Sequence, residues 1–76
     1  MATARRRVRL TFPSDLIHEP IIYRLARDFD IVVTVRRAEV TSDHGAVALD
    51  ADADEEQLER GIAWLAQQGI KVDPIG

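Results

Sequence analysis

The 76-residue sequence contains no cysteine, two histidines and only 5% aromatic residues. Without cysteine, the chain cannot form a disulfide framework, a thiolate metal site or a dithiol redox motif. The basic residues of Met1–Arg9 are not followed by the apolar run that a signal peptide needs, and no stretch reaches the roughly 20 apolar residues of a membrane-spanning helix. We therefore expect a cytoplasmic protein without direct membrane insertion.

The sequence offers few groups for catalysis. Its two histidines, His18 and His44, stand far apart, and no pair of titratable residues has the spacing that acid–base or nucleophilic chemistry requires. Asp50, Asp52 and Asp54 resemble part of a calcium loop, but the glycine and the distal glutamate of that loop are missing at the required offsets. Helix capping explains these aspartates better. We expect no enzyme activity, no metal site and no cofactor.

Length and charge indicate one small domain. A chain of this size buries about 60% of its unfolded surface, so its stability is marginal and a homodimer is favoured. We expect a flexible tail over residues 1–5 and a single domain over residues 6–76. Residues 1–40 contain eight arginines and five acidic residues, whereas residues 41–76 contain two basic and eight acidic residues. Charge pairing within the molecule or its dimer explains this asymmetry better than a basic face for an anionic partner.

Residues 18–40 predict a helix that leads directly into a strand. Glu19 and Pro20 mark the helix start, because proline is tolerated in the first turn. An apolar stripe at four-residue spacing follows, formed by Ile21, Leu25 and Phe29. The β-branched run that begins at residue 31 then predicts a strand to about residue 40. A bulge near Arg36 and Arg37 would place four apolar side chains of this strand on one face: Val33, Val35, Ala38 and Val40.

Three further strands are predicted over residues 6–12, 46–51 and 70–75. A hairpin loop at residues 41–45 offers Gly45 for a positive φ. Between the last two strands, a second helix follows the acidic stretch at Asp54, with a buried stripe of Leu58, Ile62 and Leu65. Within this helix we expect Gly61 to permit close approach to the sheet and Trp64 to pack at the edge of the core, while Gly69 ends the helix.

This order of elements predicts an α+β fold, the ferredoxin-like βαββαβ sandwich, with a four-stranded antiparallel sheet and two helices on one face. The other face of the sheet is then bare. A second copy is expected to cover it or to pair with a sheet edge, and edge pairing is favoured because buried arginines need carboxylate partners. The candidate interface residues on this face are Arg7, Arg9, Thr11, Thr34 and Arg36.

Other functions of this fold class fit the sequence poorly. RNA-binding sheets stack bases on aromatic side chains, but the outward positions of the central strands here are arginine, threonine and alanine, so we expect no nucleic acid partner. An acylphosphatase needs a glycine-rich anion loop after the first strand, where this chain has Pro13-Ser14-Asp15. Carriage of copper or zinc in its usual form needs cysteines.

Several segments resemble the NIL domain, a ferredoxin-like relative of ACT domains. These are FPSDLIHEPIIYRLARDFDIVV, then RRAEV, a polar turn with Gly45, an apolar strand, and GIAWLAQQGIKVDPI. The resemblance runs from about Val8 to Ile75. NIL domains occur at the C-terminus of methionine-importer ATPase subunits and beside iron–sulfur ferredoxin domains. This chain has no phosphate-binding loop and no cysteine run, so we expect a free-standing NIL domain.

The resemblance implies a small regulatory domain that senses an amino acid such as methionine or serves sulfur amino-acid metabolism. The alternative is an accessory module that docks on a sulfur-metabolism enzyme or transporter without binding a metabolite. If a ligand site exists, the first helix start would hold the carboxylate of an amino acid. Ser14, His18 and Glu19 are the candidate ligand-binding residues, with Glu19 placed to meet an ammonium group.

Overall fold

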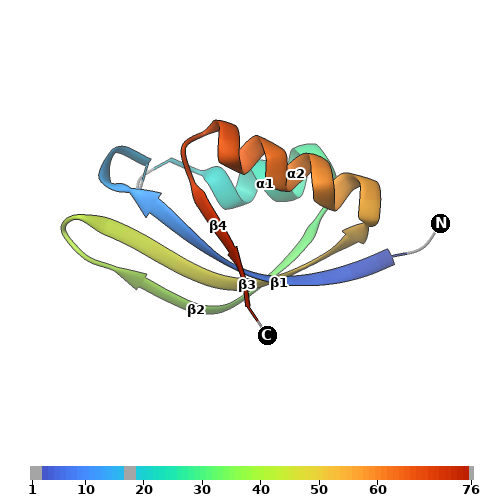
Figure 1. Cartoon of the computed structure of the whole chain (residues 1–76), viewed down its shortest axis with the longest axis horizontal. Helices are drawn as coiled ribbons and strands as arrows, with labels where there is room; N and C mark the ends of the chain where they lie inside the picture. Colours follow the sequence, from blue (N-terminus) through green and yellow to red (C-terminus); the bar gives the residue numbers. More distant parts are fainter. Residues whose placement is uncertain (1–2, 17–18, 76) are drawn as a thin grey trace.

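The computed structural model describes residues 3–16 and 19–75. Its strands and helices follow one another in the predicted order, with a short 3-10 helix after the first strand (Figure 1). The strands are β1 (Thr3–Pro13), β2 (Val32–Val40), β3 (His44–Asp54) and β4 (Lys71–Pro74). The helices are η1 (Ser14–Leu16), α1 (Ile21–Phe29) and α2 (Glu55–Gln67).

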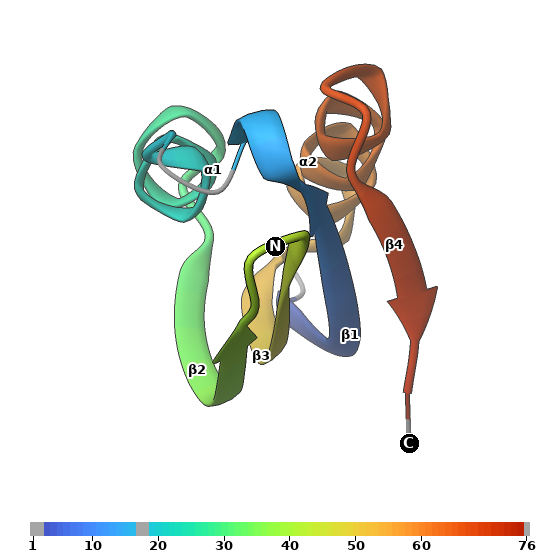
Figure 2. The same cartoon turned by 90° about the vertical axis from the view of Figure 1, so that its left-hand side faces the viewer.

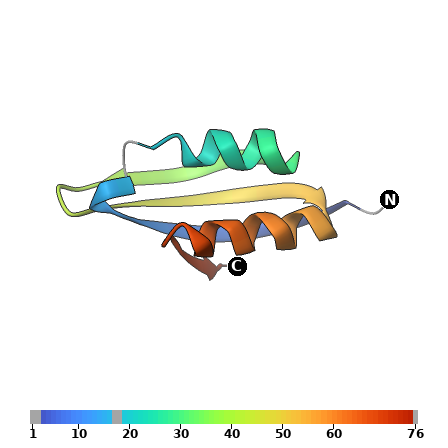
Figure 3. The same cartoon turned by 90° about the horizontal axis from the view of Figure 1, so that it is seen from above.

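The four strands form one antiparallel sheet in the order β2-β3-β1-β4. Both α-helices lie side by side on the same face of this sheet, and the opposite face has no helix (Figures 2 and 3). The fold is therefore the predicted α+β ferredoxin-like arrangement. Within the described residues, no helix is long and apolar enough to cross a membrane.

The first strand begins earlier than the sequence predicts. Thr3 pairs with Asp54 and Arg5 with Asp52, so residues 3–5 belong to β1 and not to a flexible tail. The physical reason is that β3 is longer than predicted and offers these residues a strand to pair with, and Arg5 Nε adds a cross-strand hydrogen bond of 2.8 Å to Asp52 Oδ1. Only Met1 and Ala2 of the expected tail lie outside the described residues.

The predicted bulge in β2 is confirmed. Val35 pairs with Leu49 and Arg37 with Ala48, which leaves Arg36 as the extra residue of the strand. Two consecutive arginines therefore share the helix-free face, and the apolar side chains before and after them share the helix-covered face.

The third strand is longer than predicted, and this changes how two aspartates are explained. Asp50 and Asp52 are strand residues that pair with arginines of β1, not helix caps. Asp54 occupies the N-cap position of α2, although its side chain makes no capping hydrogen bond. Gly45 was expected in a left-handed turn, but it lies in β3 opposite Val40 and its φ is not positive.

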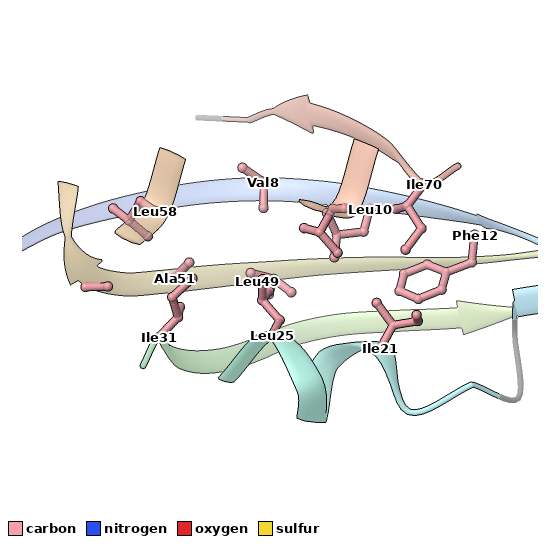
Figure 4. Packing of buried hydrophobic residues seen from close by; sticks show 12 residues of the cluster. Val8, Leu10, Phe12, Ile21, Leu25, Ile31, Leu49, Ala51, Leu58 and Ile70 are labelled. Atoms are coloured by element: carbon pink, nitrogen blue, oxygen red, sulfur yellow. The ribbon is translucent and has the colours of Figure 1, made fainter. Parts of the chain in front are cut away.

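The hydrophobic core lies between the sheet and the two helices (Figure 4). Its most completely buried large side chains come from both layers: Leu10, Ile21, Leu49, Leu58 and Leu65. Trp64 is half-buried at the margin of this core, as predicted, and its ring centroid lies 5.6 Å from that of Phe29. This aromatic pair joins α2 to α1.

Gly61 permits a close approach, but to α1 and to Ile31 between α1 and β2 rather than to the sheet. A Cβ atom at Gly61 would lie 2.7 Å from Ile31 Cδ1 and 2.9 Å from Leu25 Cδ1. Both side chains belong to the buried core. The sequence pattern could not show this neighbour, because it gives the buried stripe of a helix without the element that packs on it.

Both helices end in a left-handed residue. After α2, Gly69 has φ 87°, and the N–H of Ile70 donates to the Leu65 carbonyl at 3.1 Å. This is the predicted glycine ending in its Schellman form. After α1, Asp30 takes the same position with φ 53°, and the N–H of Ile31 donates to the Ala26 carbonyl at 3.2 Å. After each left-handed residue the chain turns so that the following isoleucine, Ile31 or Ile70, is buried in the core.

Candidate functional site

A hollow of about 200 Å³ lies where α1 starts, between this helix and the β2–β3 hairpin. Most of its wall is apolar, and among the residues that the structure describes Glu19 is the only charged one in the lining. The lining residues are Phe12, Glu19, Pro20, Ile21, Ile22, Tyr23, Val40, Gly45 and Val47. An apolar lining that includes the carboxylate of Glu19 suits a small molecule that has an apolar part and a cationic group.

The chain entering α1 is held by its own backbone. The N–H of Glu19 donates to the Leu16 carbonyl at 3.1 Å, and the Glu19 carbonyl accepts from Ile21 at 2.8 Å. Pro20 is the N-cap residue, and no side chain of residues 3–16 or 19–75 makes a capping hydrogen bond at this end of the helix. The positive end of the helix dipole is therefore available beside the hollow, where it would favour a carboxylate.

The structure places two of the three predicted ligand-binding residues, and only one of these two lines the hollow. Glu19 lines the hollow. Ser14 is exposed in η1 and is not part of the lining. His18 lies outside the described residues.

Sequence reasoning missed the part of the wall that comes from the β2–β3 hairpin. Val40 and Val47 approach the start of α1 only because the hairpin folds back along the sheet. Tyr23 gave one usable signal, because an aromatic residue on the wet side of an amphipathic helix is unusual. Its side chain is 61% exposed, and the guanidinium carbon of Arg27 lies 5.2 Å from its ring centroid.

The helix-free face of the sheet carries an ion-pair network. Asp50 is only 2% exposed, and its two carboxylate oxygens accept separate hydrogen bonds, from Arg7 Nε at 2.8 Å and from Arg36 Nη1 at 3.0 Å. The hydrogen bond from Arg7, helped by that from Arg36, lowers the pKa of Asp50 against the opposing effect of desolvation. Arginines of the first half thus pair with an acid of the second half, as the charge asymmetry predicts.

All five predicted interface residues lie on this helix-free face. Arg7 and Arg36 hold Asp50, whereas Arg9 lines a second hollow near the end of β4. Thr34 is opposite Asp50 on β2, and Thr11 is opposite Ala46 on β3. Their shared face follows from the strand register, and their role in an interface stays a prediction.

Comparisons with known proteins give a family and a fold. The family profile of the NIL domain matches residues 6–74 of the chain. No curated protein sequence matches it. A solved structure, the C-terminal domain of an ABC transporter ATP-binding protein from Enterococcus faecalis, superposes with a TM-score of 0.80 at 19% sequence identity. That superposition covers 93% of this chain and 83% of the other.

A second similar structure is a de novo designed protein, Foldit4. It superposes with a TM-score of 0.59 at 12% identity and covers 99% of this chain and 98% of the designed one. At such identities the two likenesses show the fold alone. A designed sequence that adopts the same arrangement of layers illustrates that this fold by itself implies no function.

Proposed function

Because the chain belongs to the NIL domain family, we propose that it is a non-catalytic regulatory domain that binds an amino acid in the hollow at the start of α1. The observation that carries this proposal is the combination found there: an apolar wall, the carboxylate of Glu19 and an uncapped helix start. These three features match the side chain, the ammonium group and the carboxylate of an apolar amino acid.

Methionine is the amino acid that the family resemblance favours. Its unbranched thioether chain is flexible and apolar, and it makes favourable contacts with aromatic rings such as Phe12 and Tyr23. The similar structure from Enterococcus faecalis is a domain of a transporter subunit, and by analogy we propose a role beside a transporter. The link to sulfur amino-acid metabolism comes from the family resemblance.

Nuclear magnetic resonance titration of the ¹⁵N-labelled chain tests the proposal. Adding L-methionine should shift the amide signals of Phe12, Tyr23 and Val47, which surround the hollow. N-acetyl-methionine, which lacks the ammonium group, should bind more weakly if Glu19 receives that group. Shifts confined to α2, or none at millimolar methionine, would refute the site.

Glu19→Gln provides the matching variant, because it removes the charge and keeps the size of the side chain. Affinity for methionine should fall about tenfold, which is the typical loss for one charged hydrogen bond. Glu59→Gln is the control, since Glu59 is an exposed carboxylate of α2 outside the hollow. If the Glu19→Gln and Glu59→Gln variants bind methionine with equal affinity, Glu19 does not contact the ligand.

The second candidate function is a protein-interaction module that pairs through the edge of its sheet. β2 is an edge strand, and three of its valines are well exposed: Val32 at 66%, Val35 at 51% and Val40 at 67%. Unpaired N–H and C=O groups beside exposed apolar side chains favour the addition of another strand. We propose a second copy of this chain as the partner, which would give the homodimer expected from the size of the domain.

A further inference from the structure

The helix-free face repeats one cross-strand pattern along β3, and the repeat is broken at Ala48. The outward residues of β3 are, in order, Asp52, Asp50, Ala48 and Ala46. Asp52 receives Arg5 from β1, and Asp50 receives Arg7 from β1 and Arg36 from β2. In the next row, Arg9 of β1 and Arg37 of β2 flank Ala48, which has no carboxylate to offer.

The space left by the missing carboxylate is a real hollow. Its volume is about 310 Å³, and its lining consists of Arg9, Arg37, Glu39, Ala46, Ala48 and Ile75. The two alanines come from β3, one of the two central strands, at positions that alternate with Val47 and Leu49 of the helix-covered face. Ile75 follows β4. This hollow therefore lies on the opposite face of the sheet from the hollow at the start of α1.

Charge in this row is unbalanced. Within the described part of the chain, Arg9 makes no ion pair, although Asp73 of β4 lies opposite it in register. Arg37 Nη2 contacts Glu39 Oε1 at 2.7 Å, which uses only part of the five N–H donors of its guanidinium group. An anion above Ala48 would find two guanidinium groups, as Asp50 does in the neighbouring row.

We propose that this second hollow binds a small monocarboxylate, whose carboxylate takes the place above Ala48 that the Asp50 side chain takes one row away. The ligand needs a short apolar body, because the alanines and Ile75 give the hollow apolar surfaces. A single carboxylate is specified because Glu39 would repel a second one. The proposal does not depend on amino-acid binding at α1, since the two hollows share no residue.

Butyrate is the probe, with chloride at equal ionic strength as the reference. In a titration of the ¹⁵N-labelled chain, the Nε–H signals of Arg9 and Arg37 should shift with butyrate and not with chloride. Butyrate should bind more tightly than acetate because of its apolar tail, and more tightly than succinate because of Glu39. Shifts equal to those from chloride, or tighter binding of inorganic phosphate than of butyrate, would overturn the proposal.

Two variants separate the site from general charge effects. Arg9→Gln should weaken butyrate binding about tenfold, the usual effect of losing one charged hydrogen bond. Arg5→Gln removes an equal charge from the same face but from another row, and it should leave binding unchanged. If both variants bind butyrate equally weakly, the net charge of the face explains the binding and the proposed site is contradicted.

Ala48→Asp gives the most specific test, because it builds the missing carboxylate into the chain. The new side chain should accept hydrogen bonds from Arg9 and Arg37 and abolish butyrate binding. Ala48→Ser adds only a small uncharged hydroxyl group at the same position, and it should retain binding. If the Ala48→Asp variant is folded and still binds butyrate, the carboxylate does not sit above this position and the proposal fails.

Discussion

Arg7 and Asp50 face each other across β1 and β3, and Arg7 Nε donates a hydrogen bond of 2.8 Å to an aspartate that is 2% exposed. This ion pair joins the basic first half of the sequence to the acidic second half. Asp50 also accepts from Arg36, so one buried carboxylate connects three adjacent strands.

The first prediction concerns acid stability. The folded-state pKa of Asp50 is lowered, chiefly by the Arg7 hydrogen bond, so its stabilising effect is full above the unfolded pKa of about 3.9. It is lost as the pH falls through the lower folded value. Asp50→Asn should therefore lower the melting temperature at pH 7 and should make less difference near pH 3. Asp43→Asn in the hairpin loop is the control, and equal pH profiles of the two variants would contradict the prediction.

The second prediction concerns the contact between Gly61 and Ile31. Gly61→Ala gains about 1 kcal/mol of helix propensity but places a methyl group against the Cδ1 atoms of Ile31 and Leu25. Ile31→Val removes one of these atoms and usually costs about 1 kcal/mol. In the Gly61→Ala background this cost should shrink or change sign, as a double-mutant cycle by urea unfolding would measure. Additive effects would mean that the two positions are not in contact.

The third prediction concerns Trp64. Its ring is half-buried and packs on Phe29, so Trp64→Ala should lower the free energy of unfolding by about 2 to 3 kcal/mol, below the cost for a fully buried tryptophan. Trp64→Phe keeps an aromatic pair with Phe29 and should recover about half of this loss. Chemical unfolding followed by circular dichroism measures both. An unchanged stability of Trp64→Ala would place the side chain on a surface that does not support the core.

The fourth prediction compares the two left-handed helix ends. Gly69 has φ 87° and no atom within 4 Å of an added Cβ, so Gly69→Ala tests the backbone alone and should cost about 1 kcal/mol. Asp30→Gly relieves the same backbone conformation and should be neutral or stabilising by up to about 1 kcal/mol. Thermal melts of both variants give the comparison, and stabilisation by Gly69→Ala would exclude the left-handed conformation in solution.

The fifth prediction concerns self-association. Sedimentation equilibrium at micromolar concentration should show a dimer that persists in the Arg7→Glu/Arg9→Glu double variant, because pairing along β2 leaves the sheet face free. Loss of the dimer in this variant would instead indicate contact through the helix-free face. A monomer of the unmodified chain under the same conditions would refute both geometries.

The order and type of the elements could be predicted because local signals agree with one another. Alternation in β1, the four-residue stripe of α1 and the glycine after α2 each specify one structure. Element lengths were harder to predict, because Thr3–Arg5 and Asp52–Asp54 extend β1 and β3 by pairing with each other, with one ion pair between Arg5 and Asp52. Strand propensity could not predict this extension of β3, since aspartate is unfavourable in strands.

For the candidate sites too, residues with a local sequence signal could be predicted, and residues brought in by contacts between distant segments could not. Glu19 was predicted because it belongs to a local helix-start pattern, and it does line the hollow at α1. Val40 and Val47 were missed there because they reach the hollow through the folding of the hairpin. The second hollow depends on which residue of β3 lies between Arg9 and Arg37, and only the strand register gives that neighbour.

The bulge at Arg36 also determines how β2 tolerates a change in its length. Deleting Arg36 would turn the two outward arginines into one and restore a regular alternation, with Val35 and Ala38 still facing the helices. Deleting Thr34 instead would turn the residues on one side of the deletion to the opposite face of the sheet. Apolar side chains of β2 would then point into water. Arg36 is thus a residue of β2 that can be removed while every other side chain of the strand keeps its face of the sheet.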